Sequence, residues 1–154
     1  MYGWSGNSSI IGLFVPVNES VWEHLKLGYW SAVLLALMEY SHLRGLVRNY
    51  FAARLVGVVV LEAVVLVVYY GYTAIIERTI YQIDIASYVV GAIACQYATY
   101  HVATVWRHSS FVNKACLVVF AGMGLIFAIA TYYPLRIPVI MDNNTGTYGI
   151  GSHR

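Results

Sequence analysis

The residues most able to do chemistry are two glutamates and a histidine that lie within one short polar segment. Glu19, Glu23 and His24 belong to the stretch VNESVWEHLK, residues 17–26. Two carboxylates and an imidazole can bind a divalent metal ion or a polar substrate, although their spacing matches no specific ligand signature, so the metal stays unknown. The other polar residues that we expect on the same side of the protein are Asn18, Asp84 and Asp142.

A structural role explains most of the same segment. Ser20 and Glu23 have the S-x-x-E spacing of a capping box, in which the serine side chain accepts a hydrogen bond from the backbone N–H three residues later. A helix should therefore begin near Val21. Glu23 lies in its first turn, where the helix dipole favours an anion, and Lys26 is placed to pair with it. We favour this capping and packing role, with a binding or catalytic site as the alternative.

Two further acids lie within apolar stretches, where a charge costs about 2.5 to 3.5 kcal/mol near the centre of a membrane helix. Glu62 should share a helix face with Tyr69 and Thr73, so that these side chains form a polar seam facing protein or water. Glu39 lies on a comparable stripe of the preceding helix. The two acids are either relays in a proton or cation path or partners in interhelical hydrogen bonds, and we favour the second hypothesis.

The composition indicates which solvent surrounds the protein. Of the 154 residues, 60% are hydrophobic and 10% are charged, whereas a soluble domain has about 25% charged residues. This deficit is typical of a protein that lies in a lipid bilayer. The formal net charge of +2 is too small and too scattered for nucleic-acid binding. Cys95 and Cys116 lie in apolar stretches, which favours core residues over disulfides.

The apolar stretches predict an all-α polytopic membrane bundle of four transmembrane helices, which form a single integral membrane domain over residues 1–154. Crossing the hydrocarbon core takes about 20 apolar residues. The apolar segment 10–17 is shorter than that and should precede the helices as a re-entrant or interfacial piece. The four predicted spans are residues 21–43, 50–76, 85–106 and 115–133.

Basic residues are unevenly distributed between the predicted turns. The turns near 44–50 and 107–114 hold five of them, and the turn between these two holds only Arg78. Because basic loops stay on the cytoplasmic side, both turns should face the cytoplasm or the mitochondrial matrix. We therefore expect a bacterial-type plasma membrane or a mitochondrial inner membrane. The five basic residues are Arg44, Arg48, Arg54, Arg107 and Lys114.

Small residues recur every four positions along the predicted third span. Such a stripe lets another helix approach closely, and the neighbouring Gln96 can donate a hydrogen bond across the contact. We therefore predict that other membrane subunits pack on the stripe. Its members are Ser87, Gly91, Cys95, Thr99 and Ala103.

Three motifs resemble a family of small multi-pass prokaryotic membrane proteins of unknown function. They are GNSSIIGLFVP, VNESVWEHLKL and YYPLRIPVIMDNNTGTYGI, so the resemblance covers nearly the whole chain. It implies a helical membrane protein and carries no activity, cofactor or catalytic residue. The family places a further hydrophobic span ahead of the segment that matches residues 2–7. That span is lost here, or precedes the present sequence, or is replaced by neighbouring proteins, and the last case suits a subunit of an assembly.

We expect the protein to be a structural or accessory subunit of a larger membrane assembly, with no catalysis of its own. The first alternative is a small ion- or proton-coupled transporter that uses Glu39 and Glu62. The second is a membrane-embedded enzyme with its site at Glu19, Glu23 and His24. The sequence contains no P-loop, G-x-S-x-G or H-E-x-x-H motif, so no cofactor is identified, and bound lipid is the expected small molecule.

Overall fold

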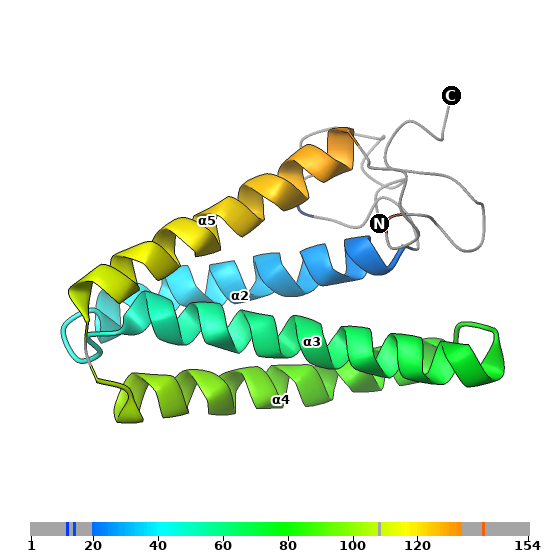
Figure 1. Ribbon diagram of the computed structural model, residues 1–154, viewed down its shortest axis with the longest axis horizontal. Helices are drawn as coiled ribbons and strands as arrows, with labels where there is room; N and C mark the ends of the chain where they lie inside the picture. Colours follow the sequence, from blue (N-terminus) through cyan, green and yellow to red (C-terminus); the bar gives the residue numbers. More distant parts are fainter. Residues whose placement is uncertain (1–11, 13, 15–19, 108, 134–139, 141–154) are drawn as a thin grey trace. The chain divides into compact units, whose positions relative to one another are not determined.

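The described residues of the computed structural model form four helices and no strand (Figure 1). The structure describes residues 12, 14, 20–107, 109–133 and 140. An all-α fold was predicted and is confirmed for these residues. The helices are α2 (Val21–Leu43), α3 (Tyr50–Ile76), α4 (Tyr81–Val105) and α5 (Ser110–Tyr132).

Among the described residues, two helices rather than four are long and apolar enough to cross a membrane by themselves. These are α3 and α5. Helix α2 contains three charged residues, and α4 contains an aspartate and two glutamines, so both have a lower mean hydropathy than the other two. Four apolar spans were predicted, but by length and composition two of these four helices, α3 and α5, are apolar enough to cross a membrane.

Helices α2 and α3 have the predicted bounds, whereas α4 and α5 begin earlier than expected. Helix α4 begins at Tyr81 because Asp84, expected in the turn, is instead an anion in the first helical turn. The hydroxyl of Ser109 accepts a 3.4 Å hydrogen bond from the Val112 N–H and so caps α5. Lys114 is consequently part of α5 and not of the preceding turn.

The chain forms two compact units, which we describe separately. The first unit, here called the terminal unit, comprises residues 1–31 and 121–154, and the second, the central unit, comprises residues 32–120. Helices α2 and α5 are each divided between the two units. Helices α3 and α4 belong entirely to the central unit.

Helices α3 and α4 pack side by side in the central unit (Figure 1). Gly57 makes this close approach feasible, because a Cβ atom there would lie 2.1 Å from the Thr99 hydroxyl oxygen and 3.0 Å from the Cys95 carbonyl oxygen. Gly91 likewise faces the backbone of Leu61, whose carbonyl oxygen would lie 3.3 Å from an added Cβ. Ala52, packed with residues of α4 and α5, continues the contact.

The small-residue stripe of α4 therefore lies against α3 of the same chain. Ser87, Gly91, Cys95 and Thr99 are all buried, and Ala103 packs on the cluster around Ala52. The stripe mediates close helix packing, as its spacing predicted, but the surface that we assigned to other subunits is occupied within the chain. The binding of other membrane subunits stays a prediction.

Two asparagines hold the helix ends together at one end of the central unit. The side-chain amide of Asn49 donates to the carbonyls of Val102, at 3.1 Å, and Trp106, at 3.0 Å, at the end of α4. The side-chain oxygen of Asn113 accepts from the backbone N–H groups of Phe51, at 2.9 Å, and Ala52, at 3.2 Å, at the start of α3. Helix ends otherwise leave such backbone groups unpaired.

Aromatic rings form much of the core of the terminal unit. Phe127 of α5 packs on two rings of α2, with centroid distances of 4.8 Å to Trp22 and 5.3 Å to Tyr29. Gly124 lies one turn before Phe127 and leaves room for Tyr29, because an added Cβ would lie 2.8 Å from the tyrosine hydroxyl oxygen. This packing joins the first half of α2 to the second half of α5.

Candidate functional site

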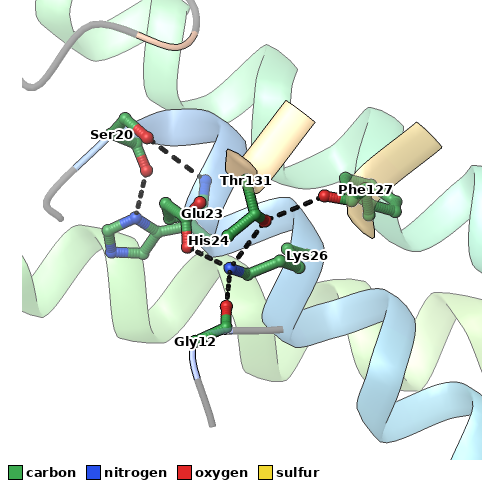
Figure 2. A network of polar contacts seen from close by, with 7 residues as sticks. All are labelled: Gly12, Ser20, Glu23, His24, Lys26, Phe127 and Thr131. Atoms are coloured by element: carbon green, nitrogen blue, oxygen red, sulfur yellow. Dashed lines mark hydrogen bonds and ion pairs between the residues drawn. The ribbon is translucent and has the colours of Figure 1, made fainter. Parts of the chain in front are cut away.

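A buried lysine is the centre of the polar cluster in the terminal unit. The side chain of Lys26 has 0% exposure, and its ammonium group has three acceptors (Figure 2). These are a Glu23 carboxylate oxygen at 2.5 Å, the Gly12 carbonyl oxygen at 2.8 Å and the Thr131 hydroxyl oxygen at 3.2 Å. An ammonium has three N–H donors, so each donor has a partner.

The threonine in this cluster uses its hydroxyl in two ways. While its oxygen accepts from Lys26, its hydrogen is donated to the Phe127 carbonyl oxygen at 2.9 Å within α5 (Figure 2). Thr131 has 0% exposure. A buried charge is tolerated when it is paired and the remaining polar groups are hydrogen-bonded, and this cluster meets both conditions.

Ser20 begins α2 as the spacing predicted. Its hydroxyl oxygen accepts from the Glu23 N–H at 3.3 Å, while the Glu23 carboxylate pairs with Lys26. The predicted helix cap and the i to i+3 ion pair are both confirmed. The His24 Nδ1 atom lies 2.9 Å from the Ser20 carbonyl oxygen. Because a carbonyl can only accept, Nδ1 is the donor in this contact.

The described structure does not test whether the other residues predicted for this site join it. Asn18, Glu19 and Asp142 lie outside the described residues. Asp84 belongs to the central unit, where its carboxylate accepts a 2.6 Å hydrogen bond from the Tyr72 hydroxyl and so ties α4 to the end of α3. The expected location of Asp84 on the same side of the protein as Glu23 and His24 therefore stays a prediction.

A second buried charge lies in the central unit, where Arg54 of α3 forms an ion pair with Glu39 of α2. The guanidinium also lies over the ring of Tyr50, 5.4 Å from its centroid. The Arg54 side chain is 6% exposed and that of Glu39 is 34% exposed. Tyr50 further joins the two helices by donating a 2.5 Å hydrogen bond to the Ala36 carbonyl oxygen.

Glu62 lies two turns beyond Arg54 on α3 and is the remaining acid predicted inside the membrane. Its Oε1 atom is buried and has no hydrogen-bond partner among the described residues. Tyr69 is half-buried, and the Thr73 hydroxyl donates to the Tyr69 carbonyl oxygen at 2.6 Å. The Thr73 hydroxyl therefore forms its hydrogen bond within α3. In the predicted polar seam, the buried Oε1 atom of Glu62 has no hydrogen-bond partner among the described residues.

The side chain of Gln96 is exposed, whereas we expected it to donate a hydrogen bond across the helix contact. It lies at the edge of a face of α4 that points away from α3, and we call this face the outer face of α4. Its large apolar members are 56 to 71% exposed. The outer face consists of Val89, Ile93, Gln96, Tyr97 and Tyr100.

The sequence does not indicate the contacts of Thr131, Asn49 and Asn113, and it groups Arg54 with the basic residues near a turn rather than with a buried ion pair. Each acts through a partner that is distant in the chain, and no short motif identifies such a pair. Among the described residues, no three side chains of the His, Cys, Asp and Glu types come together in an arrangement that could hold a metal ion. The described residues therefore do not indicate which metal ion, if any, the predicted site would bind.

These features define an all-α protein with two helices apolar enough to cross a membrane and with buried charges in ion pairs. The sequence matches the family described as a family of unknown function (DUF6512) over residues 1–150, and the chain belongs to that family. The expected membership of a family of unknown function is thereby confirmed. No curated protein and no solved structure matches the chain.

Proposed function

We propose that the protein is an integral membrane protein in which all four helices, α2 to α5, cross the bilayer. Helices of 23 to 27 residues have lengths of about 34 to 40 Å, which exceed the roughly 30 Å of a hydrocarbon core. The length and apolar composition of α3 and α5 support this proposal directly, whereas α2 and α4 need a separate argument.

The distribution of side chains on α2 supports a membrane span despite its charges. Lys26 is fully buried in the cluster described above, while Leu34, Leu37 and Met38 are 63%, 67% and 74% exposed. On α4 the small polar residues Ser87 and Thr99 are likewise turned inward. Polar groups inside and large apolar groups outside are what a lipid solvent requires. Bound lipid is the molecule that these outer surfaces would contact.

The basic residues support an orientation in this membrane. Because Arg54 is buried in an ion pair, it does not count toward the charge of a turn. The segments 44–50 and 107–114, the second of which includes the first residues of α5, then carry four exposed basic residues against one, Arg78, between α3 and α4. We place both segments on the cytoplasmic or matrix side. The four are Arg44, Arg48, Arg107 and Lys114.

We further infer that the protein is a structural or accessory subunit of a membrane assembly, without catalysis of its own. The observation that carries this proposal is the exposure of Gln96 near the midpoint of α4, a helix that we propose to cross the bilayer. Gln96 is three residues from the midpoint of α4, about 4.5 Å along the helix axis, so it lies well inside the hydrocarbon region. A polar side chain at that depth requires a protein partner or water rather than lipid.

Native mass spectrometry after gentle solubilisation of the membranes in which the full chain is expressed tests the assembly. We expect a defined set of other chains at fixed stoichiometry with this protein. Recovery of a lone monomer would overturn the proposal, and so would a homodimer with no other chain. Retention of the protein in the membrane pellet at alkaline pH tests insertion separately, since a peripheral protein would be released.

An ion- or proton-coupled transporter is the second candidate, and the unpaired buried oxygen of Glu62 favours it. Glu39 contributes less to this candidate because its carboxylate already pairs with Arg54. Purified protein in vesicles with a pH-sensitive dye would report flux, which Glu62→Gln should abolish while insertion is retained. Flux at the level of protein-free vesicles would rule this candidate out. The enzyme alternative is weakened because Glu23 is held by Lys26.

A further inference from the structure

The outer face of α4 is opposite to the surface that packs on α3. At 100° per residue, Val89, Ile93 and Tyr100 lie within about 40° of one another around the helix, and the buried positions such as Gly91 and Cys95 lie on the far side. Ile93, Tyr97 and Tyr100 are 68%, 71% and 69% exposed. This face is broad, mostly apolar and covered by no described residue of the chain.

Gln96 determines what kind of molecule can cover this face. Its amide has two N–H donors and a carbonyl acceptor. Lipid tails offer neither, and water alone would not cover the surrounding apolar residues, so a molecule that packs on this face is favoured when it also presents an acceptor and a donor at the same depth in the bilayer.

We propose that the occupant is α4 of a second copy of this chain, with the two Gln96 amides hydrogen-bonded to each other across a twofold axis. This inference rests on the proposed membrane insertion of α4, and it makes the second copy one component of the proposed assembly, whose other chains would bind other surfaces. All copies insert with the same orientation, because the distribution of basic residues fixes it. Two parallel copies related by an axis along the membrane normal therefore bring Gln96 to the same depth without any adjustment of register.

The Gln96 amide is complementary to its own copy in this arrangement. One carbonyl oxygen accepts from the other amide, and the reverse bond forms by symmetry. The tyrosines on either side add contact area, and the exposed ring of His101 lies near that of Tyr97, with centroids 6.4 Å apart. The outer face thus supplies both the polar pair and the surrounding apolar contact that an isologous interface needs.

Gln82 offers a matched control on the same helix. It is also exposed and lies on the same face of α4, but it is about 16 Å from the helix midpoint, at the edge of the hydrocarbon region. Gln96→Leu and Gln82→Leu therefore make the same chemical change at two depths.

Energy transfer between donor- and acceptor-labelled full-length chains in phosphatidylcholine and phosphatidylglycerol vesicles measures the association, with the protein-to-lipid ratio varied. We expect Gln96→Leu to weaken association by roughly threefold to thirtyfold, the range for one or two hydrogen bonds between membrane helices. Gln82→Leu should change it by less than about twofold, as for a residue outside the core. Gln96→Asn, which keeps the amide, should give an intermediate value.

Wild-type energy transfer no higher than random encounter would overturn the proposal, and so would equal effects of Gln96→Leu and Gln82→Leu. All variants are checked for retention in the membrane at alkaline pH. Release of the wild type would refute membrane insertion, whereas an inserted but monomeric protein would refute only the second copy.

Discussion

The ammonium nitrogen of Lys26 lies 3.2 Å from the hydroxyl oxygen of Thr131, a residue 105 positions later in the chain. Both side chains are fully buried. The contact joins the first turns of α2 to the last turn of α5, and the pairing of Lys26 with Glu23 supplies the opposite charge. The terminal unit is therefore held together by a polar cluster as well as by its aromatic core.

Replacing Lys26 should destabilise the protein strongly. Lys26→Met leaves the Glu23 carboxylate buried without its cation, and breaking a buried pair in this way costs about 3 to 5 kcal/mol. The free energy of unfolding can be measured in mixed micelles by titration with SDS, followed by tryptophan fluorescence. The exposed Lys114→Met is the control and should stay within about 0.5 kcal/mol of the wild type.

The double variant Glu23→Gln with Lys26→Met separates the charge effect from packing. Because it removes both charges, its cost should be smaller than the sum of the two single variants. Equal stability of Lys26→Met and Lys114→Met would show that the buried pair contributes nothing.

The Glu39 and Arg54 pair should contribute less than the Lys26 cluster. Glu39→Gln removes the carboxylate beside a buried guanidinium, and we expect a loss of about 1 to 2 kcal/mol because the Glu39 side chain is 34% exposed and partly screened. The same unfolding titration measures it. Glu77→Gln, in the exposed turn after α3, is the control. If both variants unfold at the same SDS fraction, the ion pair has no net effect.

We expect the substitution of asparagine by aspartate to have opposite effects on stability at the two asparagines that bind helix ends. Asn113 is an acceptor at the start of α3, where a negative charge is favourable, so Asn113→Asp should be neutral or slightly stabilising. Asn49 is a donor to two carbonyls, so Asn49→Asp places a carboxylate against them and should cost about 2 kcal/mol.

Alanine at each position measures the stability that is lost when the side-chain hydrogen bonds are removed without adding a charge. Asn113→Ala and Asn49→Ala should each cost about 1 kcal/mol, as for the loss of a helix cap. Unfolding by SDS again reports the values. Equal effects of aspartate at the two positions would contradict the assigned donor and acceptor roles.

The local features of this fold could be predicted from the sequence because the interacting residues lie within one helical turn. The cap at Ser20, the pairing of Glu23 with Lys26 and the bounds of α2 follow from spacing and propensity. The early start of α4 is not evident from the sequence, because an aspartate such as Asp84 suits a turn as well as the first turn of a helix.

The long-range contacts could not be predicted, for a physical reason. A threonine such as Thr131 or an asparagine such as Asn113 has the same appearance in the sequence whether it faces lipid, water or a distant helix end. The small-residue stripe illustrates the limit: its spacing correctly indicated close packing, but the sequence does not state which helix approaches. The structure assigns that role to α3, through Gly57.

Gly57 and Gly71 of α3 form a matched pair that tests this contact. A Cβ at Gly57 would lie 2.1 Å from the Thr99 hydroxyl oxygen, 3.0 Å from the Cys95 carbonyl oxygen and 3.1 Å from the Cys95 sulfur, whereas nothing lies within 4 Å of a Cβ at Gly71. Gly57→Ala should therefore separate α3 from α4 and cost about 2 kcal/mol, in the range for overpacking. Gly71→Ala should stabilise the helix by about 0.5 to 1 kcal/mol, because alanine has the higher helix propensity.

Thr99→Ala identifies the source of the Gly57 effect. With the hydroxyl removed, the 2.1 Å contact disappears and the carbonyl of Cys95 becomes the nearest atom, at 3.0 Å. The double variant Gly57→Ala with Thr99→Ala should then recover part of the lost stability, a non-additivity typical of residues in contact. Unfolding titrations of the two single variants and the double variant measure this coupling. Strict additivity, or stabilisation by Gly57→Ala alone, would mean that α3 and α4 do not approach each other at this glycine.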